Sequence, residues 1–145
     1  MKFKLEHILS ILLVAIAIGA VLFYGLDPQV AIRDRRNEQR KRDITNILNA
    51  IYMYKTQSGS FPSDIAGKER QIGTCVYDDS LCSKIHGPCL DLAPYIYTYI
   101  AGGLSHDPLT GTTTDTRYSI KQDKNNIISI EACDAENGEG IVVNR

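Results

Sequence analysis

The feature that most constrains this chain is an uninterrupted apolar stretch near its amino terminus. His7–Leu26 contains no Asp, Glu, Lys or Arg. It is about as long as the 20 apolar residues that a helix needs to cross a bilayer. These residues are therefore unavailable to a soluble core. In a chain of 145 residues, the remainder, 28–145, is expected to fold as one modest globular head.

The apolar stretch has two interpretations, a retained anchor and a cleaved secretory signal. Lys2 and Lys4 precede it as in a signal peptide, and Ala15–Ala20 supplies small residues for cleavage. Apolar character continues through Val21–Tyr24, beyond the usual end of a removable signal. We therefore expect residues 1–27 to be retained as a leader-like segment and a transmembrane helix, with cleavage as the alternative.

An amphipathic helix is predicted after Pro28, a residue that either kinks the helix or begins a second one. Neither Gly nor Pro interrupts residues 29–58, and apolar side chains recur there at helical spacing. This apolar stripe consists of Ile44, Ile47, Leu48, Ile51 and Tyr54. The sequence therefore predicts one rod from about Phe3 to about Gln57, with a membrane-spanning half followed by an amphipathic half.

The carboxy-terminal part of the chain predicts a small antiparallel sheet. A loop at 59–89 shows too little periodicity to assign, and two β-prone runs, Tyr118–Gln122 and Ile127–Glu131, then flank a hairpin turn. Ile141–Val143 is the expected third strand, so the sheet covers 118–143. The amphipathic helix is the element available to cover its apolar face. The predicted fold class is α+β, a long amino-terminal helix packed on a three-stranded sheet.

Charge is informative locally rather than in total. A net charge of −1 and a pI near 6.3 argue against nucleic-acid binding through overall charge. Six basic residues nevertheless fall within ten positions: Arg33, Arg35, Arg36, Arg40, Lys41 and Arg42. Asp34, Glu38 and Asp43 lie among or beside them, which favours a solvated, salt-bridged helix face. Contact with anionic lipid or DNA is the alternative.

Four cysteines, Cys75, Cys82, Cys89 and Cys133, all follow the apolar stretch. They would share one side of a membrane, and an even count in a small exported head predicts two disulfides. The alternative is a zinc site, because Cys75, Cys82, His86 and Cys89 include the ligand types of a Cys3His centre. The spacing lacks the tight C-x2-C pair of common zinc sites, which favours disulfides.

The sequence contains none of the common catalytic or nucleotide-binding motifs. It has no G-x-S-x-G, H-E-x-x-H, P-loop or G-x-G-x-x-G pattern. The three histidines stand far apart, and four cysteines compete for disulfides rather than serving as nucleophiles. We therefore expect no enzymatic activity and no organic cofactor, and a membrane-tethered enzyme is the least favoured class.

The order of these elements, together with particular residues, resembles type IV pilins and the pseudopilins of type II secretion systems. Arg33–Tyr54, followed by Gly59 and Phe61-Pro62, is similar to that family's charged helix, aliphatic stripe, Tyr, Gly and aromatic-Pro. The head resembles pilin-like proteins of small-genome candidate-phylum bacteria at Cys89–Leu92, Tyr99-Ile100, Asp107-Pro108, Gly111, Tyr118 and Ile128–Glu136. The similarity lies in the order of elements along nearly the whole chain.

The resemblance implies a structural subunit of a type IV pilus-like filament or a type II secretion pseudopilus, assembled through its amino-terminal helix. Its partners would be further copies of itself, the inner-membrane assembly machinery and, before assembly, the lipid bilayer. The amino terminus would lie in the cytoplasm and the head outside, and the assembled filament would be extracellular. The alternative is a single-pass membrane-anchored adhesin or binding module that does not polymerise.

Phe3 and Glu6 are the assembly residues that the resemblance implies. In the family, a prepilin peptidase cleaves after a Gly that precedes a Phe-Thr-Leu-Ile-Glu-like start, and the acidic residue pairs with a neighbouring subunit's terminal amine. Here Lys2 precedes Phe3, and Glu6 lies one position earlier than that acidic residue. The start of this chain therefore departs from the family's cleavage pattern.

The resemblance also implies a cation site and a disulfide pairing. Major pseudopilins bind calcium near an Asp-Pro turn, which makes candidate ligands of Asp107, Asp115, Asp134 and Glu136. Turn chemistry, in which Asp107 caps the turn, is the alternative. In the family, cysteines near Cys75 and Cys89 tend to occur together. That favours a Cys75–Cys89 disulfide and leaves Cys82 to pair with Cys133.

Overall fold

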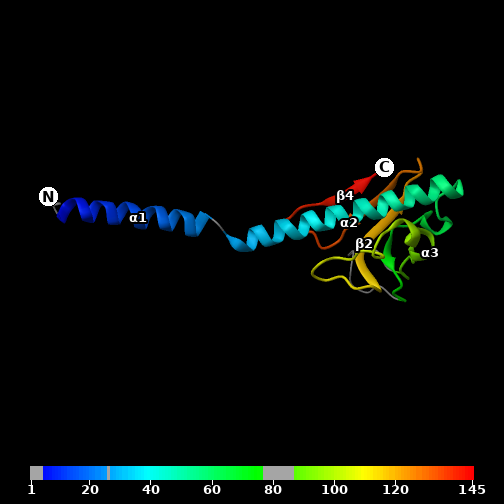
Figure 1. Ribbon diagram of the computed structural model, residues 1–145. Helices are drawn as coiled ribbons and strands as arrows, with labels where there is room; N and C mark the ends of the chain where they lie inside the picture. The colour runs from blue at the N-terminus through cyan, green and yellow to red at the C-terminus, as the bar shows by residue number, and fades with distance from the viewer. Residues whose placement is uncertain (1–4, 26, 77–86) are drawn as a thin grey trace. The chain divides into compact units, whose positions relative to one another are not determined.

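The computed structural model describes residues 5–25, 27–76 and 87–145 (Figure 1). The chain divides into two compact units, Met1–Ile32 and Arg33–Arg145. The second unit contains the sheet and the main apolar core, so the mixed helix-and-sheet class that the sequence predicts is confirmed.

The helix predicted as one rod is two helices. α1 spans Leu5–Gly25 and α2 spans Pro28–Ser58. Asp27 precedes α2 and caps its amino-terminal end. Its Oδ1 accepts a 2.9 Å hydrogen bond from the backbone N–H of Gln29, and its carbonyl oxygen accepts one from the backbone N–H of Val30. Asp followed by Pro is a favourable helix start, which supplies a cap and a residue already set in the helical φ. The prediction of a continuous rod is therefore wrong, and the alternative in which Pro28 begins a second helix is confirmed.

The two helices differ in character. α2 is a predominantly polar helix that carries the cluster of basic residues and only a one-sided apolar stripe. Within the described residues, no helix combines the length and the apolar character needed to cross a bilayer. The membrane-spanning half of the predicted rod stays a prediction.

The sheet has four antiparallel strands, whereas the sequence predicted three. Their order in the sheet is β1 Arg70–Gly73, β2 Asp115–Gln122, β3 Ile128–Ala132 and β4 Ile141–Asn144. β1 lies in the segment predicted as loop 59–89 and pairs with β2 at Arg70↔Ile120 and Gln71↔Ser119. A strand of four residues shows too little alternation to be recognised in the sequence.

The predicted hairpin between β2 and β3 is confirmed. Gln122 pairs with Ile128, and Asp123 Oδ1 accepts hydrogen bonds from the backbone N–H groups of Asn125 and Ile127. Asn126 adopts a φ of +63°, a conformation that Asn tolerates better than most residues. The side chains of the turn therefore fix the register of the hairpin.

The core forms where α2 lies along one side of the sheet (Figure 1). Three residues of the stripe, Ile44, Ile47 and Ile51, are fully buried, and Leu48 is almost so. They join a cluster with the sheet residues Tyr118, Ile120, Ile128 and Ile130, as predicted. The short helices η1 Ser63–Ile65, α3 Ala93–Ile96 and η2 Tyr97–Tyr99 border the cluster. It includes Ile65 of η1, Ile96 of α3 and Leu92, the residue before α3.

Candidate functional site

The first candidate surface is α1 itself. Nine large apolar side chains of this helix are 52% to 71% exposed: Ile8, Leu9, Ile11, Leu12, Leu13, Val14, Ile16, Ile18 and Val21. Their positions lie on all sides of the helix, because consecutive residues are 100° apart around its axis. A helix that is apolar all round is stable when it is surrounded by other apolar groups. We therefore expect the apolar surface of α1 to be covered by other apolar groups.

The second candidate is a partly buried group of charges that joins α2 to two loops of the head. We call Arg36, Arg40, Asp107 and Glu136 the arginine clasp. Arg40 is fully buried, and its Nε lies 2.6 Å from Asp107 Oδ2 while its Nη1 lies 2.8 Å from Glu136 Oε2. Arg36 makes two hydrogen bonds to the same Glu136, from Nε at 2.6 Å and from Nη2 at 2.5 Å.

Neutral groups complete the clasp. Asn37 accepts a hydrogen bond from Arg40 Nη1 at 2.8 Å and exchanges two hydrogen bonds with the backbone of Glu136. Asp107 Oδ1 also accepts from the backbone N–H groups of Leu109 and Thr110. Asp107 therefore caps its turn, as the turn alternative predicted, and also binds an arginine 67 residues away.

The turn that carries Asp107 depends on a glycine. A Cβ at Gly111 would lie 2.5 Å from the backbone nitrogen of Asp107, which is too close for any side chain. Gly111 also donates its N–H to the Asp107 carbonyl at 3.1 Å. The close approach of these two backbone segments holds Asp107 where Arg40 reaches it.

The clasp changes the acidity of its carboxyl groups. Burial would raise the pKa of Asp107, but hydrogen bonds from Arg40, Leu109 and Thr110 outweigh it and hold that pKa below its ordinary value. Hydrogen bonds from Arg36 and Arg40 lower the pKa of Glu136 to about 2. Both carboxylates are therefore charged at neutral pH.

The four acidic residues expected to bind calcium have other partners in this structure. Asp107 and Glu136 belong to the arginine clasp, and Asp134 pairs with Arg117 through contacts of 2.6 and 2.9 Å. Asp115 accepts a hydrogen bond from Gln71. Throughout residues 5–25, 27–76 and 87–145, no three His, Cys, Asp or Glu side chains are grouped to hold a metal ion. The calcium site stays a prediction.

A disulfide joins Cys75 to Cys89, so this predicted pairing is confirmed, with their Cα atoms 5.2 Å apart. Because these sulfurs are oxidised, they are not the thiolates that the alternative zinc site requires. Cys133 is also disulfide-bonded, while its expected partner Cys82 and the zinc candidate His86 lie outside the described residues. The Cys75–Cys89 bond stabilises the head by about 3 kcal/mol in the chain-entropy model.

The predicted assembly residues are not described in atomic detail. Phe3 lies outside the described residues. Glu6 is placed as a position in α1, but its side chain lies outside what the structure describes. Their role in assembly stays a prediction.

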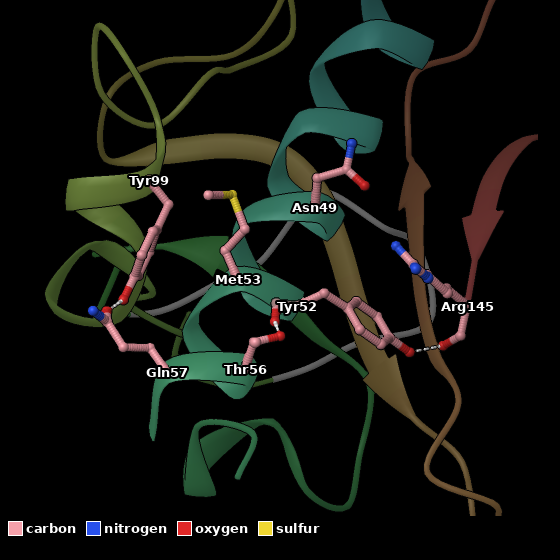
Figure 2. Close-up of a pocket in the computed structure, with 7 residues that line it drawn as sticks. All are labelled: Asn49, Tyr52, Met53, Thr56, Gln57, Tyr99 and Arg145. Atoms are coloured by element: carbon pink, nitrogen blue, oxygen red, sulfur yellow. Dashed lines mark hydrogen bonds between the residues drawn. The ribbon is translucent and has the colours of Figure 1, made fainter. Parts of the chain in front are cut away.

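The third candidate is an open groove of about 810 Å³ on the head (Figure 2). It is lined by Asn49, Tyr52, Met53, Thr56, Gln57, Tyr99 and Arg145. The Tyr52 hydroxyl donates to the backbone carbonyl of Arg145, whose guanidinium carbon lies 4.9 Å from the centre of the Tyr52 ring. Tyr99 donates to the side-chain oxygen of Gln57, so each tyrosine is anchored at its hydroxyl and offers its ring to the groove.

Sequence reasoning missed both the groove and the clasp. Each is assembled from segments far apart in the chain, such as Arg36 and Glu136, which are 100 residues apart. The one signal for the groove was Met53, a large apolar residue that is exposed on a mostly polar helix.

The comparisons with known proteins add no identification. No protein-family model, curated protein or solved structure matches the chain. The exposed apolar helix, the arginine clasp and the groove are therefore the features that indicate a function.

Proposed function

We propose that this protein is a structural subunit that polymerises through α1, in the way of the type IV pilins and secretion pseudopilins that it resembles. The supporting observation is the contrast between the two units. Arg33–Arg145 contains a closed core, whereas the described large apolar side chains of α1, from Ile8 to Val21, are more than half exposed. Removing apolar surface from water contributes about 25 cal/mol per Å², so a helix with this much of it gains stability from a partner.

Copies of the same helix are a suitable partner. Small residues such as Ala15, Ala17 and Gly19 alternate with large aliphatic ones, and a Cβ on Gly19 would meet no atom within 4 Å. Small residues allow helices to approach closely where the hydrophobic effect alone does not select a partner. Before assembly, the bilayer would cover the same surface, with the amino terminus in the cytoplasm and the head outside.

The head would be the part that the filament displays. Its fold is held by the core, the arginine clasp and the Cys75–Cys89 disulfide, so it does not need neighbouring copies for its own stability. The protein acts in this proposal by position and by contact, and no catalytic step is assigned to it.

The groove favours a second candidate function. A membrane-anchored binding module would use α1 only as an anchor and would bind a ligand in the groove beside Tyr52, Met53 and Tyr99. Anchored aromatic rings beside one arginine suit a ligand that is both apolar and anionic. The two candidate functions differ in whether the protein polymerises.

Electron microscopy of sheared surface fractions, with mass spectrometry of the subunit's amino terminus, tests the proposal. We expect fibres that contain a subunit retaining α1. The variant Leu12→Gln/Ile16→Gln should lack fibres, because it places amides in the helix interface. The matched control Ile127→Gln/Val142→Gln changes two exposed apolar residues of the head and should keep them. A monodisperse membrane monomer in wild type would overturn polymerisation and support the binding module.

A further inference from the structure

The six basic residues at the start of α2 fall into two groups in the structure. Arg36 and Arg40 turn toward the head and are engaged in the arginine clasp. The other four are exposed: Arg33, Arg35, Lys41 and Arg42. We call these four residues the basic surface. In the part of the chain that the structure describes, no salt bridge engages any of them.

The sequence predicted that neighbouring acidic residues would form salt bridges along this helix face, and within the described residues the structure shows a different arrangement. Asp43 is turned inward, where it accepts a 3.1 Å hydrogen bond from the Tyr118 hydroxyl. Its pKa is raised by burial, although the nearby Arg42 charge opposes that shift. The helix therefore loses one carboxylate from its outer face.

The two remaining carboxylates of this stretch do not balance the four cations. Asp34 accepts a hydrogen bond from the Asn137 amide at 2.8 Å, and Glu38 is exposed. Since each residue turns the helix by about 100°, Arg35 and Arg42 lie on the helix face opposite to Ile44 and Ile51. Glu38 and Lys41 lie on the flank between the two faces, whereas Arg33, at the start of the cluster, is exposed on the side of the two isoleucines. An excess of positive charge is therefore presented to the surroundings, and no salt bridge within the described residues engages it.

We propose that the basic surface binds the phosphate groups of anionic lipids. This inference rests on the proposed function, because it requires that α1 brings the chain to a membrane. The order of the sequence supports it. His7–Leu26 contains no Asp, Glu, Lys or Arg, and Asp27 is the only such residue between this stretch and Arg33. Stable membrane attachment commonly combines an apolar segment with an adjacent basic one.

The chemistry of the side chains suits this ligand. A guanidinium group donates two parallel hydrogen bonds to a phosphate, and three of the four residues are arginines. Each Lys or Arg close to an anionic membrane surface strengthens binding by roughly fivefold. A long polyanion such as DNA fits less well, because it needs an extended basic surface and the whole chain has a net charge of −1.

Lipid retention by the full-length chain tests the inference. The protein is purified in a neutral detergent and mixed with equal amounts of phosphatidylglycerol and phosphatidylcholine, and the retained lipids are measured by mass spectrometry. We expect wild type to retain phosphatidylglycerol several-fold in excess, and salt should weaken the preference. Arg35→Gln/Arg42→Gln should lose this excess, so that the two lipids are retained in nearly equal amounts. Lys121→Gln/Lys124→Gln removes two exposed cations elsewhere on the head and should leave the preference unchanged.

Equal retention of the two lipids by wild type would overturn the inference, as would an unchanged preference in Arg35→Gln/Arg42→Gln. Displacement of phosphatidylglycerol by duplex DNA at the same phosphate concentration would also overturn it, because the surface would then be a site for polyanions. The fibre experiment separates this result from the proposed function. Fibres without a lipid preference would leave polymerisation standing, and a lipid preference without fibres would support the inference alone.

Discussion

The stripe of α2 and the surface of α1 contain the same kinds of aliphatic residue with opposite exposure. Ile44, Ile47, Leu48 and Ile51 are at most 5% exposed, because they occupy one side of their helix and the sheet covers that side. The aliphatic residues of α1 surround their helix, so no single layer of structure can cover them. Residue type alone therefore does not decide whether a side chain is buried. The distribution of the aliphatic residues around the helix decides whether they are buried within one chain or between chains.

The core of the head should give the largest effect when it is truncated. Ile47→Ala is expected to lower the free energy of unfolding by about 4 kcal/mol, since a fully buried aliphatic side chain leaves a cavity in the core. The matched change in α1, Leu12→Ala, should stay within about 0.5 kcal/mol of wild type, because Leu12 is exposed. Urea denaturation of the full chain in detergent, followed by tyrosine fluorescence, measures both. Equal effects of the two changes would contradict the difference in burial between Ile47 and Leu12.

The arginine clasp should give the next largest effect. Arg40→Met keeps most of the side-chain volume but leaves the buried Asp107 carboxylate without its cation, at a cost of about 3 kcal/mol. Asp107→Asn added to Arg40→Met should recover part of that loss, because the buried charge is then removed. Arg35→Met is the control on the exposed face of the same helix. The same denaturation experiment applies, and a loss for Arg35→Met as large as that for Arg40→Met would contradict this assignment.

Lowering the pH should give the smallest of the three effects on the stability of the head. The pKa of Glu136 is lowered from 4.5 to about 2, and that of Asp107 is also lowered. The unfolded chain therefore binds protons more readily, so the stability from these groups is present above pH 4.5 and is lost as pH falls toward 2. The raised pKa of Asp43 acts in the opposite direction, because protonation there favours the folded state.

Thermal melts across this acid range measure the effect. Wild type should show a falling melting temperature, and Glu136→Gln should show a flatter dependence from a lower starting value, since it lacks the titrating group. Asp43→Asn should steepen the fall, because it removes the opposing contribution. A melting temperature of wild type that is constant through this range would show that the clasp carboxylates contribute nothing to acid sensitivity.

Elements with local signals could be predicted from the amino-acid sequence alone. α2 begins at Pro28, because a proline favours the first turn of a helix. It ends at Ser58, because the glycine that follows favours a helix end. Alternating residues and an Asp-Lys-Asn-Asn turn marked the β2–β3 hairpin, and the spacing of Ile44, Ile47 and Ile51 marked the core face. The Cys75–Cys89 pairing followed from the resemblance and not from local signals.

Only the tertiary structure decided how distant residues combine. β1 has four residues and is a strand because β2 supplies its hydrogen bonds. Arg40 looked like its exposed basic neighbours in the sequence, yet it is buried because a turn closed by Gly111 places Asp107 against it. Periodicity reports which side of an element is apolar. It does not report which charge of a mixed cluster meets a carboxylate from a loop 67 or more residues away, because that choice depends on the packing of the whole head.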